Sequence, residues 1–130
     1  MQIVNSFPPN HNQIKQFIPH TKGNVYCYGS QIYAPDSTEI PEDIIFHEAT
    51  HKSQQERFTN PDLWWQQYCF DKDFRLQEEL EAYANQYQWV KKYINSTAAA
   101  YMLEEAAFNL KEIYGLSISH GEAKSKIRNR

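Results

Sequence analysis

The chain has 130 residues, of which 41% are hydrophobic and 22% are charged, a balance typical of a single globular domain over residues 1–130. Its net charge of -3 excludes a general attraction to nucleic acid or to an anionic membrane surface. No stretch has the pattern of a signal peptide or of a transmembrane helix, so we expect a cytoplasmic protein with no membrane partner.

The first third of the chain predicts a small lobe that contains strands. Residues 2–7 predict a short strand, and residues 12–17 have weak helical spacing. Residues 25–33 carry two apolar and aromatic runs on either side of Gly29-Ser30, which is the pattern of a β-hairpin. This lobe precedes a longer helical part.

The other two-thirds of the chain predict helices. Pro41 suits a first helical position, Asn95 suits an N-cap and Gly115 suits the residue after a helix. The first two helices are expected at about residues 41–58 and 61–70. A third begins at a cap formed by Asp71 or Asp73 and ends at about residue 93, and a fourth covers about residues 97–114. A last short helix is introduced by the capping box Ser119-x-x-Glu122. Together these elements predict an α+β fold with a mainly helical body and a small N-terminal hairpin lobe.

The chemistry of the sequence is concentrated in the first long helix, where residues 47–51 read H-E-x-x-H. Positions i and i+4 lie one turn apart on the same face of a helix, so His47 and His51 can bind one Zn²⁺ ion. Glu48 can then reach a water molecule activated by that ion and act as a general base. This motif predicts a zinc hydrolase.

Two histidines do not complete a catalytic zinc site, which usually has three protein ligands and one open position. The metzincin continuation requires Gly and His at two positions that hold Gln54 and Arg57, so that class is excluded. The remaining candidates for the third ligand are the glutamates of the next long helix and three histidines elsewhere: Glu78, Glu79, Glu81, His120, His11 and His20.

The helical wheel of residues 76–94 separates the three glutamates. Glu79 lies about 60° from the centre of the apolar face, whereas Glu78 and Glu81 lie much farther round. A third ligand must point into the protein, so the periodicity favours Glu79, with Glu81 as the alternative ligand. Glu78 is expected on a solvated face.

The H-E-x-x-H motif followed about thirty residues later by a helical Glu resembles the gluzincin superfamily of zinc peptidases. In several branches the second motif reads E-x-x-A followed by Asp, Asn or Tyr, which Glu79-Leu80-Glu81-Ala82-Tyr83 matches. A thermolysin-like register would instead run from Glu81 to Asn85, with Asn where Asp is usual. The segments HEATHKSQQ, WWQQY and FRLQEELEAYANQY, within about residues 40–93, are similar to small bacteriophage metallopeptidases. The resemblance implies a zincin-like fold, bound Zn²⁺ and hydrolysis of a peptide or protein substrate.

Several other residues are candidates for supporting roles. Tyr83 lies one turn from Glu79 and can donate to an oxyanion, orient a ligand or pack in the core. Gln54 and Gln55 follow the histidines and can hold the ligands in place. In gluzincin-like enzymes an edge strand near the motif helix binds the peptide backbone, and we extend this role to residues 31–34 as a hypothesis.

The sequence therefore predicts a zinc peptidase with His47, His51 and Glu79 as ligands and Glu48 as the general base. One alternative is a zinc-stabilised helical binding module without catalysis. A second alternative is a metal-free interaction protein with aromatic helices. Cys27 and Cys69 form no C-x-x-C pair, which favours free thiols.

Overall fold

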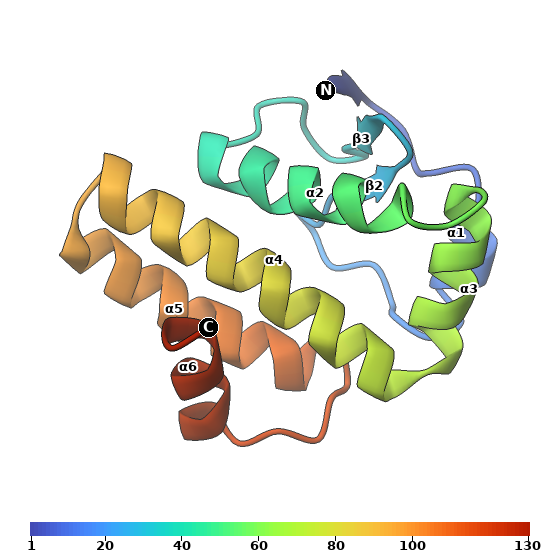
Figure 1. Cartoon of the computed structure of the whole chain (residues 1–130). Coiled ribbons are helices and arrows are strands. Elements are labelled where there is room, and N and C mark those ends of the chain that lie inside the picture. The colour runs from blue at the N-terminus through green and yellow to red at the C-terminus, as the bar shows by residue number, and fades with distance from the viewer.

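Helix α4 (Lys72–Tyr93) runs through the middle of the molecule, and the other elements are arranged around it (Figure 1). It packs against α2 (Glu42–Gln55) on one side and against α5 (Ser96–Glu112) on another. Helices α3 (Pro61–Phe70) and α6 (His120–Arg128) also contact it, and the short α1 (His11–Ile14) packs against α3. The computed structural model describes all residues, 1–130.

Side-chain caps begin most of the long helices where the sequence predicts. Each capping oxygen accepts a hydrogen bond from the backbone N–H three residues later, which satisfies one of the free donors at a helix start. The caps of α3, α4, α5 and α6 are Asn60, Asp71, Asn95 and Ser119.

Helix α2 departs from its predicted bounds at both ends. Pro41 has an extended ψ of 149° and stands outside the helix, so Glu42 is the first helical residue. The helix ends at Gln55 because the amides of Arg57 and Phe58 bond to carbonyls three residues earlier, which tightens the last turn. The expected end near residue 58 was therefore about one turn too late.

The sheet contains β1 (Gln2–Val4), β2 (Tyr26–Tyr28) and β3 (Gln31–Tyr33) in the order β1-β3-β2. The predicted hairpin is confirmed, since β2 and β3 pair antiparallel, and Gly29 has a φ of 62° at the turn. Strand β1 pairs in parallel with β3, so β3 is the central strand. The hypothesis that residues 31–34 form a free edge for a peptide is wrong, because both sides of β3 are occupied.

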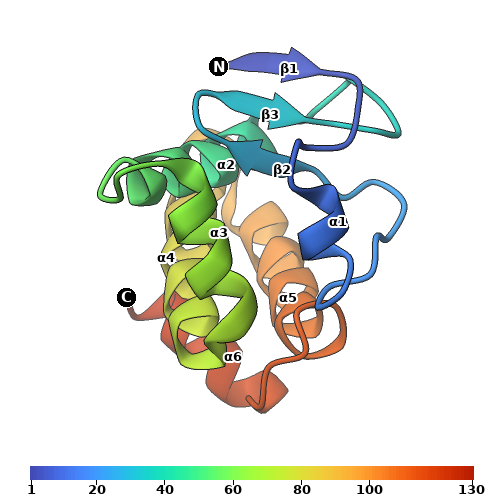
Figure 2. The ribbon, with the colours of Figure 1, turned by 90° about the vertical axis from the view of Figure 1, so that its right-hand side faces the viewer.

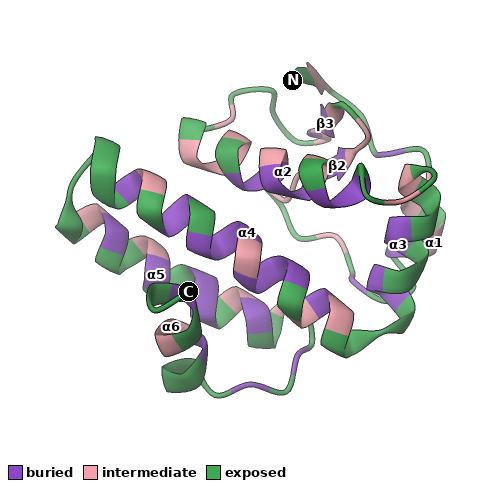
Figure 3. Ribbon diagram, in the orientation of Figure 1, coloured by how far each residue is buried: buried purple, intermediate pink, exposed green.

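The sheet and the helical body lie on opposite sides of α2 (Figure 2). Strand β2 contacts α2 from one side and α4 contacts it from the other, which leaves α2 between two layers. Buried positions occur along the length of α4 (Figure 3). None of the helices has both the length and the apolar character that crossing a membrane requires.

Two apolar clusters flank the contact between α2 and α4. The larger cluster joins α4, α5 and α6 and is rich in leucine and alanine, and it includes Leu103 and Leu110. The smaller cluster joins α1, β2 and α3 and is mostly aromatic, with Trp64, Trp65 and Tyr68. Both cysteines are buried free thiols. The fold is thus a mainly helical α+β structure with a small three-stranded sheet.

Candidate metal centre

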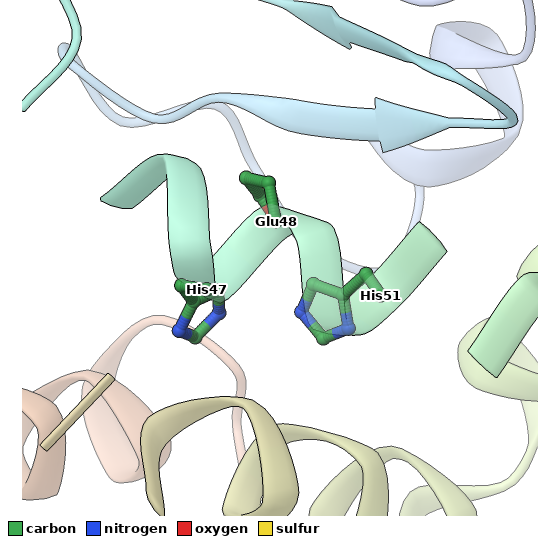
Figure 4. Close-up of side chains that lie close together, drawn as sticks. All are labelled: His47, Glu48 and His51. Carbon is green, nitrogen blue, oxygen red and sulfur yellow. The ribbon is translucent and has the colours of Figure 1, made fainter. Parts of the chain in front are cut away.

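Helix α2 carries the two histidines and the glutamate of the H-E-x-x-H motif on different sides. Both imidazoles point from α2 toward α4, whereas Glu48 leaves the helix on the side facing the strands (Figure 4). The side chains are buried, with 6% exposure for His47 and 5% for both Glu48 and His51. One donor atom from each residue lies within 4.8 Å of the others, so this buried group can hold a metal ion.

Glu79 projects from α4 between the two imidazoles. Its Oε1 lies 3.2 Å from Nε2 of His47, and its Oε2 lies 3.2 Å from Nε2 of His51. Each separation is close to the roughly 3.3–3.4 Å between two donor atoms of a tetrahedral zinc site, and each imidazole faces a different oxygen of Glu79. Oε1 of Glu79 is buried and has no hydrogen-bond partner, which leaves it free to bind a cation.

Two glutamine amides determine which nitrogen of each imidazole carries a proton. Nε2 of Gln54 donates to the Glu78 carbonyl at 3.0 Å, so Oε1 of Gln54 faces Nδ1 of His51 at 2.8 Å. Nε2 of Gln86 donates to Asp43 at 2.8 Å, so Oε1 of Gln86 faces Nδ1 of His47 at 2.9 Å. Both Nδ1 atoms must therefore donate, and in the neutral imidazoles both Nε2 lone pairs point toward Glu79.

The two imidazoles and the Glu79 carboxylate require a cation between them. Two nitrogen lone pairs facing two carboxylate oxygens repel one another unless a proton or a metal ion lies between them. Burial acts to lower the pKa of His51, but the adjacent Glu79 carboxylate raises it to about 10. Burial acts to raise the pKa of Glu79, but the charge on His51 and the contacts with both imidazoles hold it well below its usual range. The Glu79 carboxylate is thus ionised, as a metal ligand must be.

Tyr68 of α3 supports the other oxygen of Glu79. Its hydroxyl donates to Oε2 at 2.5 Å, and its pKa is raised well above its usual value, first by burial and then by the Glu79 charge. The phenol therefore remains protonated and acts as a donor. A neutral donor at this position fixes the orientation of the carboxylate without competing for a metal.

Glu48 has a different environment from Glu79. Its Oε2 is buried without any hydrogen-bond partner. Burial raises the pKa of Glu48, with a smaller opposing contribution from the charges of His51 and His47. The Glu48 carboxyl group therefore keeps a proton to a higher pH than the Glu79 carboxyl group.

Two cavities meet at Glu48. The larger one, about 150 Å³, lies on the His47 side and is bounded by residues 23–25, α2, α4 and α5. The smaller one, about 20 Å³, lies on the His51 side beside Glu79 and Tyr68. Tyr114 lines both cavities. The buried motif is therefore reachable from a hollow, and Glu48 stands at the junction.

The three glutamates of α4 have different surroundings. Glu79 contacts both imidazoles, whereas Glu81 reaches His51 only through Gln54, whose Nε2 donates to it at 2.8 Å. Glu78 was expected on a solvated face, and this expectation is wrong. It is 9% exposed and accepts a hydrogen bond from Nε1 of Trp64 at 3.0 Å, because α3 covers that side of α4.

The other candidate ligands lie in other contacts. His120 pairs with Glu104 between α6 and α5. His20 bonds to the Tyr26 hydroxyl and to Asp36 in the N-terminal lobe, and His11 stacks on Phe7 there. None of these three imidazoles belongs to the buried group of residues 47–51.

Of the residues predicted to support the site, Tyr83 and Gln54 lie beside the histidines and Gln55 does not. Tyr83 lines the larger cavity, and its ring centroid lies 4.5 Å from that of His47, while its hydroxyl accepts a 3.3 Å bond from Asn109. Gln54 contacts His51 as described, but Gln55 bonds to the Cys27 carbonyl and the Gly29 amide and so attaches the hairpin to α2.

The contacts of Tyr68 with Glu79 and of Gln86 with His47 were not predicted from the sequence. Gln86 lies seven residues after Glu79, two helical turns along the same face, and this spacing was a usable signal. Tyr68 approaches from α3, and no sequence spacing relates that helix to Glu79. Arg75 of α4 donates to two backbone carbonyls at the end of α3 and to the Tyr114 carbonyl just after α5.

In comparisons with known proteins, the chain matches no protein-family model, no curated protein and no solved structure. The resemblance to gluzincin-type peptidases therefore depends on the motifs alone. The geometry of the buried group is an independent observation.

Proposed function

We propose that this chain is a zinc-dependent peptidase of zincin-like architecture, with His47, His51 and Glu79 as ligands and Glu48 as general base. The observation that carries the proposal is the position of Glu48. A buried carboxylate with an unpartnered oxygen stands beside the ligand pair and at the junction of two cavities. A site that only stabilised the fold would have no use for this second carboxylate.

The donor set favours zinc. Two neutral imidazole nitrogens and one carboxylate oxygen are the ligands that Zn²⁺ takes in catalytic sites. Ca²⁺ and Mg²⁺ prefer six or more oxygen ligands, and the two imidazoles provide none. Gln54 and Gln86 hold both rings in the tautomer that a metal requires.

When bound, zinc would supply a water molecule of lowered pKa and a Lewis acid that polarises the scissile carbonyl. Glu48 would accept one proton from a water molecule as the oxygen adds to the carbonyl carbon. It would return this proton to the amide nitrogen as the C–N bond breaks, which releases an amine and a carboxylic acid. Tyr83, which lines the same cavity, is the proposed donor to the oxyanion or the residue that orients His47.

A second function, the zinc-stabilised binding module, is favoured by the depth of burial. All three proposed ligands are at most 6% exposed, and closed metal sites in proteins are often structural. This alternative predicts stoichiometric zinc and a large loss of stability in chelator without any turnover.

The Glu48→Gln variant distinguishes the two functions. It keeps the shape of the side chain but cannot accept a proton, so we expect zinc content close to that of the native protein and at least a roughly hundredfold lower rate of peptide hydrolysis. Glu56→Gln is the matched control, because Glu56 lies just after α2 and pairs only with Lys52 at the surface. Mass spectrometry of a peptide library after incubation measures both rates.

Native rates in the Glu48→Gln protein would contradict the assigned base. Bound zinc without hydrolysis in any variant, including the native chain, would favour the binding module.

A further inference from the structure

The larger cavity is lined by acidic side chains and by no basic lysine or arginine. Asp43, Glu48 and Glu105 are the only residues with ionisable carboxylates that line it, and no lysine or arginine does. Its remaining walls include Ile44 and Met102, which are apolar. A hollow with apolar walls and acidic groups favours a ligand that combines a hydrocarbon part with a positive charge.

Glu48, which also supports the proposed function, is a buried polar group that faces this cavity without a partner. It is 5% exposed, its Oε2 has no partner, and it lines the cavity. A divalent ion would balance the charges of Glu79 and Glu48. Asp43 and Glu105 would then remain as uncompensated negative charges beside the site, since no cation of the chain lines the cavity.

The edge of the sheet next to α2 is already occupied at one position. Strand β3 is paired on both sides, and β2 is the edge strand next to α2. The Cys27 carbonyl of β2 already accepts hydrogen bonds from Gln55 at 2.8 Å and from Trp65 at 3.0 Å. A peptide cannot add to this edge at Cys27 without displacing both side chains.

We propose that the larger cavity is a subsite for a cationic group of the peptide substrate, either a lysine or arginine side chain or a free amino terminus. This inference rests on the proposed function and specifies its substrate class. The cavity volume of about 150 Å³ is the size that holds one benzene-sized group, so it admits a single side chain. The apolar walls contact the hydrocarbon stem, and Asp43 and Glu105 receive the charge.

Glu105 is the residue that tests the subsite. Asp43 also accepts a hydrogen bond from Gln86 and thereby supports His47, so its substitution would disturb the metal centre. Glu105 is exposed on α5 and has no such connection. Glu112, also exposed on α5 but outside the cavity, is a matched control for the same loss of charge.

A binding experiment tests the subsite without turnover. n-Pentylammonium has the stem and charge of a lysine side chain, and 1-pentanol is its neutral counterpart. Titrated into the zinc-loaded chain and followed by NMR, the ammonium should bind at least about fivefold more tightly and shift the signals of Ile44 and Met102. Glu105→Gln should weaken its binding about threefold, whereas Glu112→Gln should not.

Peptide cleavage then identifies the source of the charge. With both ends blocked, a peptide containing lysine should be cleaved faster than its norleucine analogue if a side chain fills the subsite. A norleucine peptide with a free amino terminus should be cleaved faster than its acetylated form if the terminus fills it. Either preference should shrink in Glu105→Gln and at high salt, which screens the charges.

Equal binding of pentylammonium and pentanol would overturn the inference, as would an equal loss in Glu105→Gln and Glu112→Gln. Hydrolysis without any preference for a cation would also overturn it and leave the peptidase function standing. Selective ammonium binding in a chain that cleaves no peptide would support the subsite and reject the peptidase function.

Discussion

Helix α4 has two buried sides that differ in chemistry. Toward α5 and α6 it contributes Leu80, Tyr87 and Val90 to an apolar cluster. Toward α2 it contributes Glu79 and Gln86, which are as deeply buried but contact imidazoles. One helix therefore joins an ordinary hydrophobic core to a buried polar interface.

The two sides have opposite effects on stability. Burial of apolar surface stabilises the fold by about 25 cal/mol per Å². Burial of carboxylates and imidazoles costs free energy unless each charge is paired and hydrogen-bonded. We infer that the α4–α5–α6 core holds the chain together, and we propose that the α2–α4 interface is stabilised when it binds a metal.

The largest expected effect is on metal binding when a ligand is removed. Glu79→Gln should weaken zinc affinity roughly a thousandfold, because one of three protein donors and its charge are lost. Competition with a chromogenic chelator measures the affinity. Glu81→Gln is the control, since Glu81 contacts neither imidazole directly, and its effect should be far smaller. A greater loss in Glu81→Gln than in Glu79→Gln would reverse the assignment of the third ligand.

A substitution of Leu110, which lies on α5, tests the apolar cluster on the other side of α4. Leu110 is fully buried in the apolar cluster, so Leu110→Ala should destabilise the chain by about 2–4 kcal/mol through lost burial and a cavity. Urea unfolding with and without zinc measures this loss. The stabilisation that zinc adds should be the same in native and variant chains, because the two sides act independently. A variant that loses zinc affinity would show that they do not.

The pH dependence of metal binding follows from His51. Without metal, Glu79 raises the pKa of His51 to about 10 against the opposing effect of burial. The stability that this pairing provides is complete below the unfolded pKa of about 6.5 and is lost as the pH rises through about 10. A metal must displace the His51 proton, so its apparent affinity should rise about tenfold per unit between about pH 6 and pH 8.

Isothermal titration in buffers of different ionisation enthalpy measures the protons released, and about one per metal ion is expected. An affinity that stays constant over these two pH units would show that His51 carries no proton in the metal-free interface.

The smallest predicted effect concerns the glutamine that orients His47. Gln86→Ala should weaken zinc affinity about 10- to 100-fold, because the imidazole loses the acceptor that fixes its tautomer. Gln88→Ala is the control, as Gln88 is exposed on the same helix. Equal affinities in the two variants would show that Gln86 does not support the site.

Local signals in the sequence were sufficient for most of the helices. Asn60, Asp71, Asn95 and Ser119 cap helices near the predicted starts, because capping depends on residues within one turn. The hairpin turn at Gly29 is local for the same reason. The placement of Glu79 toward the histidines follows from helical periodicity, and its role as ligand stays a prediction.

Features that depend on contacts between distant segments could not be predicted from the sequence. The pairing of β1 with β3 makes β3 central, and no local pattern determines which strands become neighbours. Glu78 was misplaced because periodicity on α4 cannot reveal that Trp64 of α3 covers that side. Tyr68 was missed for the same reason, since its bond to Glu79 exists only once α3 packs on α4.

The most direct test of the account is anomalous diffraction at the zinc absorption edge from crystals grown with zinc. We expect one strong peak per chain, within bonding distance of Nε2 of His47, Nε2 of His51 and the Glu79 carboxylate, with Glu48 beside it but not bound. A peak ligated by Glu48 or Glu81 in place of Glu79, or no peak between α2 and α4, would contradict it.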